Sequence, residues 1–295
     1  MKRRFLVVAL TAVVLLATLT PAAAQDAVKA EIRQAIDAAC LNGFWNGLDI
    51  KAFLAGWDHG AMAPMRLMQT GDFAYVNVTE LIALDLRNNR KPSEKKEFTF
   101  LYPVIDVTGG IAMARVEAMR GETIVNTNYF PVVRTKTGWK IVGFPSYMHK
   151  DGARPETPPG EADAVKKVVE DTLVRGLMQD GTKEQVLAGV AGPFCDINFY
   201  LPELDVVTKL DLTTVFAGKS HLSSMGLKLR PLKNSAFTLI GLTGHVAAGK
   251  LAVTFDSGTV MTMYVALFKL KTGWAIVHIT TDKHIAVIAD RANSR

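Results

Sequence analysis

The chain has 295 residues, of which 49% are hydrophobic and 21% are charged, and its formal net charge is +6. Its two cysteines, Cys40 and Cys195, are too few for a small disulfide-stapled scaffold. Lysines and arginines are interspersed with acidic residues. A nucleic-acid surface needs a sustained basic face with aromatic platforms, so no nucleic acid is expected among the partners.

The first 24 residues have the features of a secretory signal. Three basic residues at positions 2–4 precede an apolar run from Phe5 to Leu19, and small residues at positions 22–24 suit cleavage. A membrane anchor is the weaker alternative, because polar residues interrupt a run that is barely long enough to span a bilayer. We predict a signal peptide at 1–24, a periplasmic or secreted protein, and no membrane span after signal cleavage.

After the signal, the sequence repeats itself. Tyr129–Val142 reads YFPVVRTKTGWKIV and Tyr264–Val277 reads YVALFKLKTGWAIV, at an offset of 135 residues. Near the start of each half, Asn42-Gly43-Phe44 corresponds to Arg175-Gly176-Leu177 at an offset of 133 residues. A period this long predicts one whole domain present twice. A polar, proline-rich linker at 150–161 separates domain 1 (25–149) from domain 2 (162–285), and a tail follows at 286–295.

Each half begins with helices. Apolar residues at three-to-four spacing predict an amphipathic first helix at 28–44 and again at 165–177. A short second helix follows, with Asp49 as its N-cap in the first half and Thr182 in the second. A third short helix is expected at 79–86 and at 211–216.

Strands follow the helices. Period-two stretches with glycine at the turns lie at 98–107, 111–118, 124–134 and 139–144, and then at 237–242, 246–255, 260–269 and 274–281. Helices followed by an antiparallel meander predict an α+β domain whose helices cover one face of a bent sheet. Trp139 and Trp274 each follow a turn glycine on the last strand, where a large aromatic side chain is expected in the core.

This order of elements resembles the nuclear transport factor 2-like (NTF2-like) superfamily and, within it, the SnoaL-like or lumazine-binding-like domains. The residues that carry the resemblance are Lys136–Val142, Lys271–Val277, Phe53–His59 and Val78–Leu84. The resemblance implies two tandem cone-shaped domains, each with N-terminal helices packed on a curved antiparallel sheet. Isomerases, dehydratases, cyclases, binding modules and dimerisation units share this fold, so the fold alone does not define the function.

Asp58 and His59 are the candidate catalytic residues. They follow the second helix, where enzymes of the NTF2-like superfamily often place an acid or a base, and a histidine beside a carboxylate can take a proton. The alternative is a polar pair at a helix end that faces solvent. Val190, Ala191 and Gly192 stand around this position in the second half, so any such site is present once.

Polar residues on two strands are candidates for ligand binding. Tyr102 and Asp106 lie on one strand, with side chains on the same face if the strand is regular. On the strand at 124–134, Asn126 and Asn128 alternate with Tyr129. The candidate ligand-binding residues are therefore Asn126, Asn128, Tyr102, Asp106 and Tyr129.

The second half replaces the two asparagines with Met261 and Met263. If this face lines the domain interior, domain 1 can form hydrogen bonds with a ligand, whereas the interior of domain 2 is apolar or filled. If it is an outer face, the two methionines are buried between the domains.

The histidines and cysteines offer few further candidates for a functional site. The six histidines have no metal-binding spacing, so no metal and no cofactor are expected. Cys40 lies on the apolar side of the first helix, which predicts a buried thiol, although an oxidising compartment also permits a Cys40–Cys195 bridge.

Two classes of function follow. The favoured one is a non-catalytic protein whose two domains form an intramolecular pseudo-dimer, alone or as a homo-oligomer, and bind a small apolar molecule or a protein partner. The alternative is an isomerase, cyclase or dehydratase that uses domain 1, with Asp58 and His59 as acid and base.

Overall fold

The structure is a computed structural model that describes residues 21–47, 49–66, 73–78, 80, 97–179, 181–192, 195–212, 214–215, 227–283 and 289–291. Residues 1–20 of the predicted signal peptide lie outside this range, as do most of the helix expected at 79–86 and most of the tail at 286–295. Among the described residues, no helix combines the length and the apolar character needed to cross a membrane.

Domain 1 begins with three helical segments. They are α2 (Pro21–Ile36), a π-helical continuation η1 (Asp37–Trp45), and the short α3 (Ile50–Gly56). Ile32 and Ile36 are fully buried, in agreement with the predicted apolar stripe. The predicted N-cap is confirmed, because the Asp49 carboxylate accepts a hydrogen bond from the backbone N–H of Ala52 at 3.0 Å.

Domain 2 repeats this arrangement. It begins with α5 (Glu161–Val169), the π-helical η2 (Glu170–Met178) and α6 (Lys183–Ala188). The predicted Thr182 cap is confirmed, because its hydroxyl accepts a hydrogen bond from the N–H of Gln185 at 3.2 Å. Of the third helix expected at 211–216, Leu212, Thr214 and Val215 are helical.

The sheet of domain 1 is mixed, in the order β2-β1-β6-β5-β4-β3. β1 runs parallel to β6, and the short β7 pairs with β5. The strands are β1 (Trp57–Arg66), β2 (Phe73–Asn77), β3 (Phe98–Thr108), β4 (Ile111–Arg120), β5 (Thr123–Thr135), β6 (Gly138–Gly143) and β7 (Ser146–Met148).

The sheet of domain 2 has the order β11-β12-β13-β14-β8-β9. β8 runs parallel to β14, as β1 does to β6. The strands are β8 (Asp196–Leu201), β9 (Val206–Asp211), β11 (Leu232–Thr243), β12 (Val246–Phe255), β13 (Val260–Leu270) and β14 (Gly273–Thr281), and β10 (Leu227–Leu229) pairs separately with β15 (Ala289–Arg291).

The two sheets have the same topology. When the order of domain 1 is read from β3, each strand except β7 has a counterpart in the sheet of domain 2, from β3 and β11 at one edge to β2 and β9 at the other. The predicted architecture of two α+β domains, each with helices ahead of the sheet, is confirmed. Two details differ. The sheets are mixed rather than antiparallel, and the sequence did not predict the strands β1, β2, β7, β8, β9, β10 and β15.

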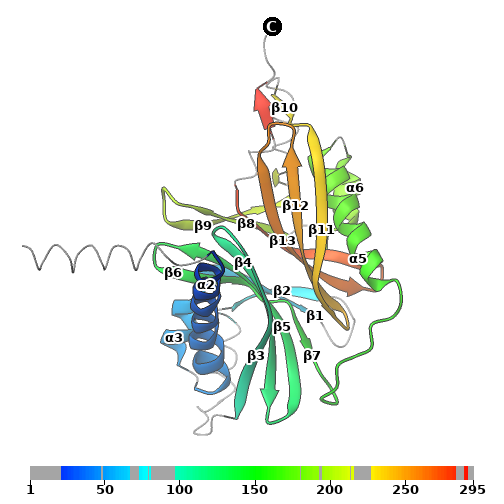
Figure 1. Ribbon diagram of the computed structural model, residues 1–295. Coiled ribbons are helices and arrows are strands. Elements are labelled where there is room, and N and C mark those ends of the chain that lie inside the picture. The colour runs from blue at the N-terminus through cyan, green and yellow to red at the C-terminus, as the bar shows by residue number, and fades with distance from the viewer. Residues whose placement is uncertain are drawn as a thin grey trace, which may run out of the picture.

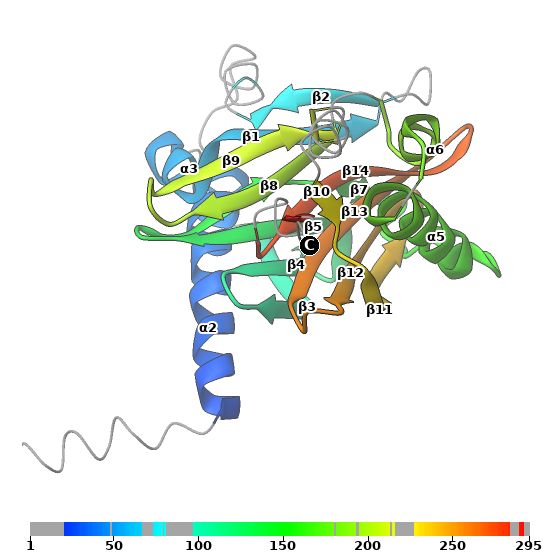
Figure 2. The ribbon, with the colours of Figure 1, turned by 90° about the horizontal axis from the view of Figure 1, so that it is seen from above.

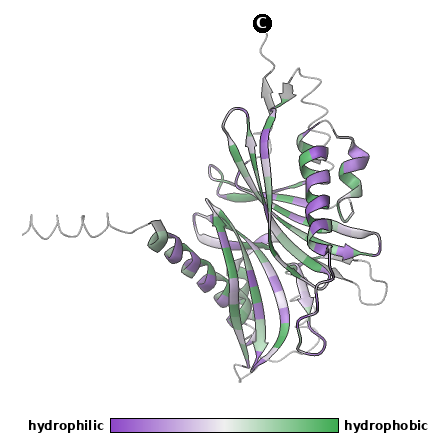
Figure 3. Ribbon diagram, turned by 45° about the vertical axis from the view of Figure 1, so that its right-hand side comes forward, coloured by the Kyte–Doolittle hydropathy of each residue, from purple (hydrophilic) through white to green (hydrophobic). Residues whose placement is uncertain are grey.

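Each domain has its own core between its helices and its sheet. In Figure 3 hydrophilic and hydrophobic residues alternate along the helices, as expected of helices that bury one face. Trp139 and Trp274 are only 5% and 6% exposed, so the prediction that both are core residues is confirmed. Each indole N–H also reaches a glutamate of the first helix, Trp139 to Glu31 at 3.3 Å and Trp274 to Glu161 at 2.5 Å.

The two sheets pack against each other. Figure 1 shows α2 and α3 on one outer side of the molecule and α5 and α6 on the other, with the sheets between them, and Figure 2 gives the same arrangement from above. Buried side chains of both sheets form a third cluster at this interface, which includes Ile111, Met113, Tyr129, Val133, Val246, Tyr264, Phe268 and Val277.

Polar contacts across this interface follow an approximate two-fold symmetry. The Tyr129 hydroxyl lies 3.1 Å from the Thr243 hydroxyl, and the equivalent Tyr264 hydroxyl lies 3.3 Å from that of Thr108. Tyr129 and Thr108 of domain 1 are equivalent to Tyr264 and Thr243 of domain 2. The same tyrosine–threonine contact is therefore made twice, as in a symmetric homodimer. The two domains therefore form an intramolecular pseudo-dimer.

The chain between β7 and α5 is attached to domain 1. The Arg154 guanidinium donates a hydrogen bond to the buried Glu117 carboxylate at 2.5 Å, and Arg115 pairs with the same carboxylate at 2.9 Å. The His149 ring lies 2.8 Å from the Thr127 hydroxyl and 2.8 Å from the Ala153 carbonyl. These contacts hold the start of the interdomain segment against the sheet.

Candidate functional site

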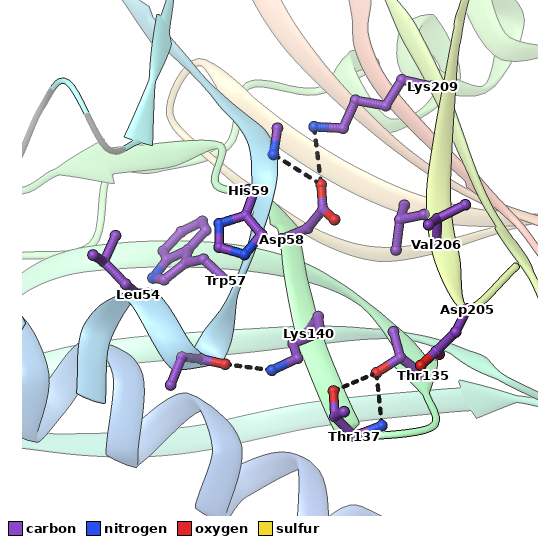
Figure 4. Close-up of a pocket in the computed structure, with 13 residues that line it drawn as sticks. Leu54, Trp57, Asp58, His59, Thr135, Thr137, Lys140, Asp205, Val206 and Lys209 are labelled. Atoms are coloured by element: carbon purple, nitrogen blue, oxygen red, sulfur yellow. Dashed lines mark hydrogen bonds and ion pairs between the residues drawn. The ribbon is translucent and has the colours of Figure 1, made fainter. Parts of the chain in front are cut away.

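A cleft of about 730 Å³ lies where the two domains meet, and both domains line it. Domain 1 supplies the end of α3, the start of β1 and the β5–β6 hairpin, whereas domain 2 supplies β9 and the turn before it. Figure 4 shows these side chains around the cleft. Its walls include Leu54, Trp57, Asp58, His59, Thr137, Lys140, Asp205, Val206, Val207 and Lys209.

Asp58 and His59 both line this cleft, but they do not act as a pair. Asp58 accepts a hydrogen bond from the N–H of Gly60 at 3.1 Å and forms an ion pair with Lys209 of domain 2 at 3.2 Å. The His59 side chain is exposed. No hydrogen bond between His59 and Asp58 occurs among the described contacts, so Asp58 links the domains and does not orient the imidazole.

Both candidate catalytic residues follow α3, as predicted, and lie at the start of a strand. The sequence WDHGAMAPMR forms β1, whose pairing with β6 is interrupted between Trp57 and Met62. Glycine at position 60 leaves room for the Lys209 side chain, because a Cβ there would lie 2.5 Å from the ammonium nitrogen. The interrupted strand therefore accommodates the domain 2 lysine.

Tyr102 and Asp106 lie on opposite faces of β3. The register of β3 against β4 shifts between Leu101 and Val104, so the expected regular alternation is interrupted. Tyr102 packs with the domain 1 core and donates a hydrogen bond to Asp37 at 2.6 Å, and burial together with this bond raises the pKa of Tyr102. The expectation for a regular strand, that Tyr102 and Asp106 share one face, is therefore wrong.

Asp106 and Tyr129 belong to the interface between the domains. Asp106 forms an ion pair with Lys250 at 2.7 Å and accepts a hydrogen bond from Tyr264. Tyr129 is fully buried at the interface, where burial raises its pKa. Both residues are thereby engaged by domain 2.

Asn126 and Asn128 face the core of domain 1. Asn128 pairs in register with Val116 and Asn126 with Ala118, on the face of the sheet that carries Phe130 and packs against the helices. Asn126 is 5% exposed and its side-chain oxygen accepts a hydrogen bond from Ser146 at 3.3 Å. Asn128 is fully buried, and neither its amide nitrogen nor its amide oxygen has a partner among the described residues.

The equivalent face of domain 2 is filled. Met261 and Met263 are fully buried in the domain 2 core rather than between the domains. Of the two alternatives left open by the sequence, the interior face is therefore correct. Domain 1 has buried amides where domain 2 has thioethers.

Sequence reasoning missed the residues that domain 2 and β6 bring to the cleft. Lys140 lies on β6 and donates a hydrogen bond to the Ala55 carbonyl at 2.5 Å, and Lys209 lies on β9. Lys209 meets Asp58 only because the two sheets pack together. Lys140 lies in the repeated motif Lys136–Val142, but its counterpart in the second half is Ala275, so the repeat does not mark it.

The cysteines are unpaired. Cys40 and Cys195 are free and buried, so the alternative of a bridge between them is not realised. Burial raises the pKa of both thiols. Among the described residues, no group of three or more histidine, cysteine or carboxylate side chains could hold a metal ion.

Comparisons with known proteins return structures of the NTF2-like class. No family model matches the chain, and no curated protein matches it. It is similar to an NTF-2 like protein of unknown function from Silicibacter pomeroyi DSS-3, at 16% identity over 44% of this chain and 100% of that chain, with a TM-score of 0.34. It is also similar to NTF2-like proteins of unknown function from Shewanella baltica OS155 (14% identity, 44% and 98% coverage, TM-score 0.34) and Methylobacillus flagellatus KT (18% identity, 44% and 96% coverage, TM-score 0.33).

Proposed function

We propose that the protein is a non-catalytic binding protein of the periplasm or the extracellular space. Its two NTF2-like domains form a pseudo-dimer, and the interior of domain 1 binds a small, mainly apolar molecule that carries a polar group. The observation that carries this proposal is the buried amide of Asn128, which has no hydrogen-bond partner among the described residues.

A buried amide without hydrogen bonds is energetically unfavourable. Leaving a buried donor or acceptor unpaired costs roughly 1–3 kcal/mol, and the large majority of buried polar groups in proteins are paired. Asn128 has both a donor and an acceptor in this state. A ligand with a complementary polar group would pair with them, and its apolar part would contact the surrounding core near Val116 and Phe130.

The geometry of Asp58 and His59 supports binding over catalysis. A general base requires a partner that orients it and a substrate within hydrogen-bond reach. Asp58 is engaged by Lys209 and Gly60, and the described contacts give His59 no orienting group. Asp58 and His59 are therefore not arranged as an acid–base pair.

The substitution Asn128→Leu tests the proposal through two effects of opposite sign. Leucine has a similar volume and no unpaired polar atoms, so we expect the ligand-free protein to become more stable in urea unfolding. We also expect retention of the natural ligand, measured by mass spectrometry of the purified protein, to weaken by about 1–3 kcal/mol. Loss of stability with unchanged retention would contradict the proposal.

Thr127→Val is the matched control on the same strand. Thr127 lies on the opposite face and pairs with His149. This variant should lose stability and keep its ligand. Turnover of any substrate that is abolished by His59→Ala, with the fold intact, would replace the binding function by the enzymatic alternative.

A further inference from the structure

We infer that the cleft between the domains is a second binding site, for an amphipathic monocarboxylate. The negative head group binds at Lys140, and the apolar chain extends along a neighbouring groove lined by alanine and glycine. This site is distinct from the interior of domain 1 and does not depend on the proposed function.

Among the described charges that line the cleft, Lys140 and Asp205 form no ion pair, but the Asp205 carboxylate already has two hydrogen-bond donors. Asp58 and Lys209 neutralise each other. Asp205 accepts hydrogen bonds from the Tyr200 hydroxyl at 2.5 Å and from the N–H of Lys136 at 3.1 Å. Lys140 forms no ion pair among the described residues.

Lys140 has donors available for a ligand. An ammonium group has three N–H donors, and one of them reaches the Ala55 carbonyl at the end of α3. In Figure 4 Lys140 lies below Asp58 and His59, with Val206 on the other side of the cleft. An ammonium group with free donors beside apolar side chains matches a ligand with one negative charge and an apolar part, whereas the Asp205 carboxylate is already occupied by two donors.

A second hollow provides space for the apolar chain. It has a volume of about 420 Å³ and shares Ala55, Thr137 and Lys140 with the cleft, so the two hollows meet at Lys140. Small side chains of α2, η1 and α3 form much of its wall, namely Ala35, Ala38, Ala52, Ala55 and Gly56. Glu31 and Gln34 also line this hollow, and Glu31 is paired with Arg134 at 3.5 Å. The wall of small residues gives the apolar chain its contacts.

Titration of the whole protein with decanoate, followed by isothermal calorimetry, tests this site. We expect affinity to rise with chain length from butyrate to decanoate, by up to about fourfold per buried methylene. Lys140→Met should weaken decanoate binding by roughly 10- to 100-fold, the range expected for loss of a hydrogen bond to a charged group. Decanol should bind more weakly than decanoate and should not respond to Lys140→Met.

Two further variants separate the parts of the site. Lys136→Met removes a neighbouring charge of the same hairpin that does not line the cleft, so decanoate affinity should stay unchanged. Ala38→Leu narrows the groove and should weaken decanoate more than butyrate. Asn128→Leu should leave decanoate binding intact, which keeps this test independent of the proposed site in domain 1.

Two results would overturn the inference. One is the absence of decanoate binding up to millimolar concentration by the folded wild-type protein. The other is an equal decanoate affinity of the Lys140→Met and Lys136→Met variants, since the head group would then bind elsewhere.

Discussion

At the residue scale, Trp139 and Trp274 show how one sequence motif serves both halves. In each half the chain turns at a glycine with positive φ, +114° at Gly138 and +121° at Gly273, and the next residue inserts an indole into the core. A side chain other than glycine would be strained at this turn. The repeated Gly-Trp pair thus combines a backbone requirement with a packing requirement.

Deletion of either indole should strongly destabilise the protein. Trp274→Ala is expected to cost roughly 3–5 kcal/mol, because it leaves a cavity in the core and removes the hydrogen bond to Glu161. Trp274→Phe keeps most of the apolar volume and should cost less. Urea unfolding measures both, and a loss below about 1 kcal/mol for the alanine variant would show that the indole does not support the core.

At the element scale, the π-helical stretches η1 and η2 begin and end at equivalent positions, 133 residues apart. Each contains a glycine at the point where the next helix approaches. A Cβ at Gly43 would lie 2.8 Å from the backbone nitrogen of Phe53, and one at Gly176 would lie 2.8 Å from a methyl group of Val186. The repeated Gly in the sequence therefore reflects close helix packing.

Gly43→Ala should consequently destabilise domain 1 by roughly 1–3 kcal/mol, the usual effect of overpacking. The contact atom belongs to the backbone of α3, which cannot rotate away as a side chain can. Gly110→Ala is the matched control, because a Cβ there would meet only the Cβ of Arg134 at 4.0 Å. Equal unfolding midpoints of the two variants would show that α3 moves without resistance.

Most regular elements could be predicted from the sequence because their signals are local. Helical spacing, the caps at Asp49 and Thr182 and the alternating strands each depend on neighbouring residues. β1 could not be predicted, since Gly60 and Pro64 interrupt any alternation and its pairing with β6 is made across the fold. The shift in β3 was equally hidden, and it places Tyr102 and Asp106 on opposite faces.

The candidate ligand-binding residues were predicted only in part, because contacts made across the fold leave no local signal in the sequence. The comparison of the two halves, amides against methionines, identified Asn126 and Asn128 as candidates, but only the structure decides that they lie on an interior face. Tyr129 has the same polar character as a ligand-binding residue, but its hydroxyl contacts Thr243 of the other domain. A partner 114 positions away cannot be inferred from local alternation.

At the scale of the whole molecule, the contact between the domains contains a buried histidine. His278 is 3% exposed, its ring lies 2.9 Å from the Thr280 hydroxyl, and a Cβ at Gly143 of domain 1 would lie 2.8 Å from the ring. Burial, with a smaller effect of the Lys209 charge, lowers the pKa of His278 to about 3. Protonation is thus disfavoured in the folded protein.

The lowered pKa of His278 predicts that the folded protein loses stability in acid. The unfolded chain binds a proton at His278 below pH ~6.5, whereas the folded protein binds it only near pH 3. Between these two pH values the unfolded state therefore takes up more protons than the folded state. The free energy of unfolding falls as the pH decreases through this window, by up to roughly 1.4 kcal/mol per pH unit. Asp196 and Asp282 act in the opposite direction, because burial raises their pKa values and the folded state then takes up protons more readily.

Urea unfolding of two variants between pH 7 and pH 4 measures how much His278 contributes to the pH dependence of stability. His278→Gln should flatten the pH dependence relative to the wild type, whereas His59→Gln, at an exposed position, should leave it unchanged. A wild-type slope preserved in His278→Gln would assign the acid sensitivity to other groups.

The pseudo-dimer has a consequence that no symmetric homodimer can share. On one side of the interface Asp106 pairs with Lys250, whereas at the equivalent place Gly241 leaves room for Tyr129 and Arg115. In a homodimer every substitution occurs twice and must suit both positions at once. Joining the copies in one chain removes that constraint, so the interior of domain 2 can be filled by methionines while the interior of domain 1 keeps buried amides.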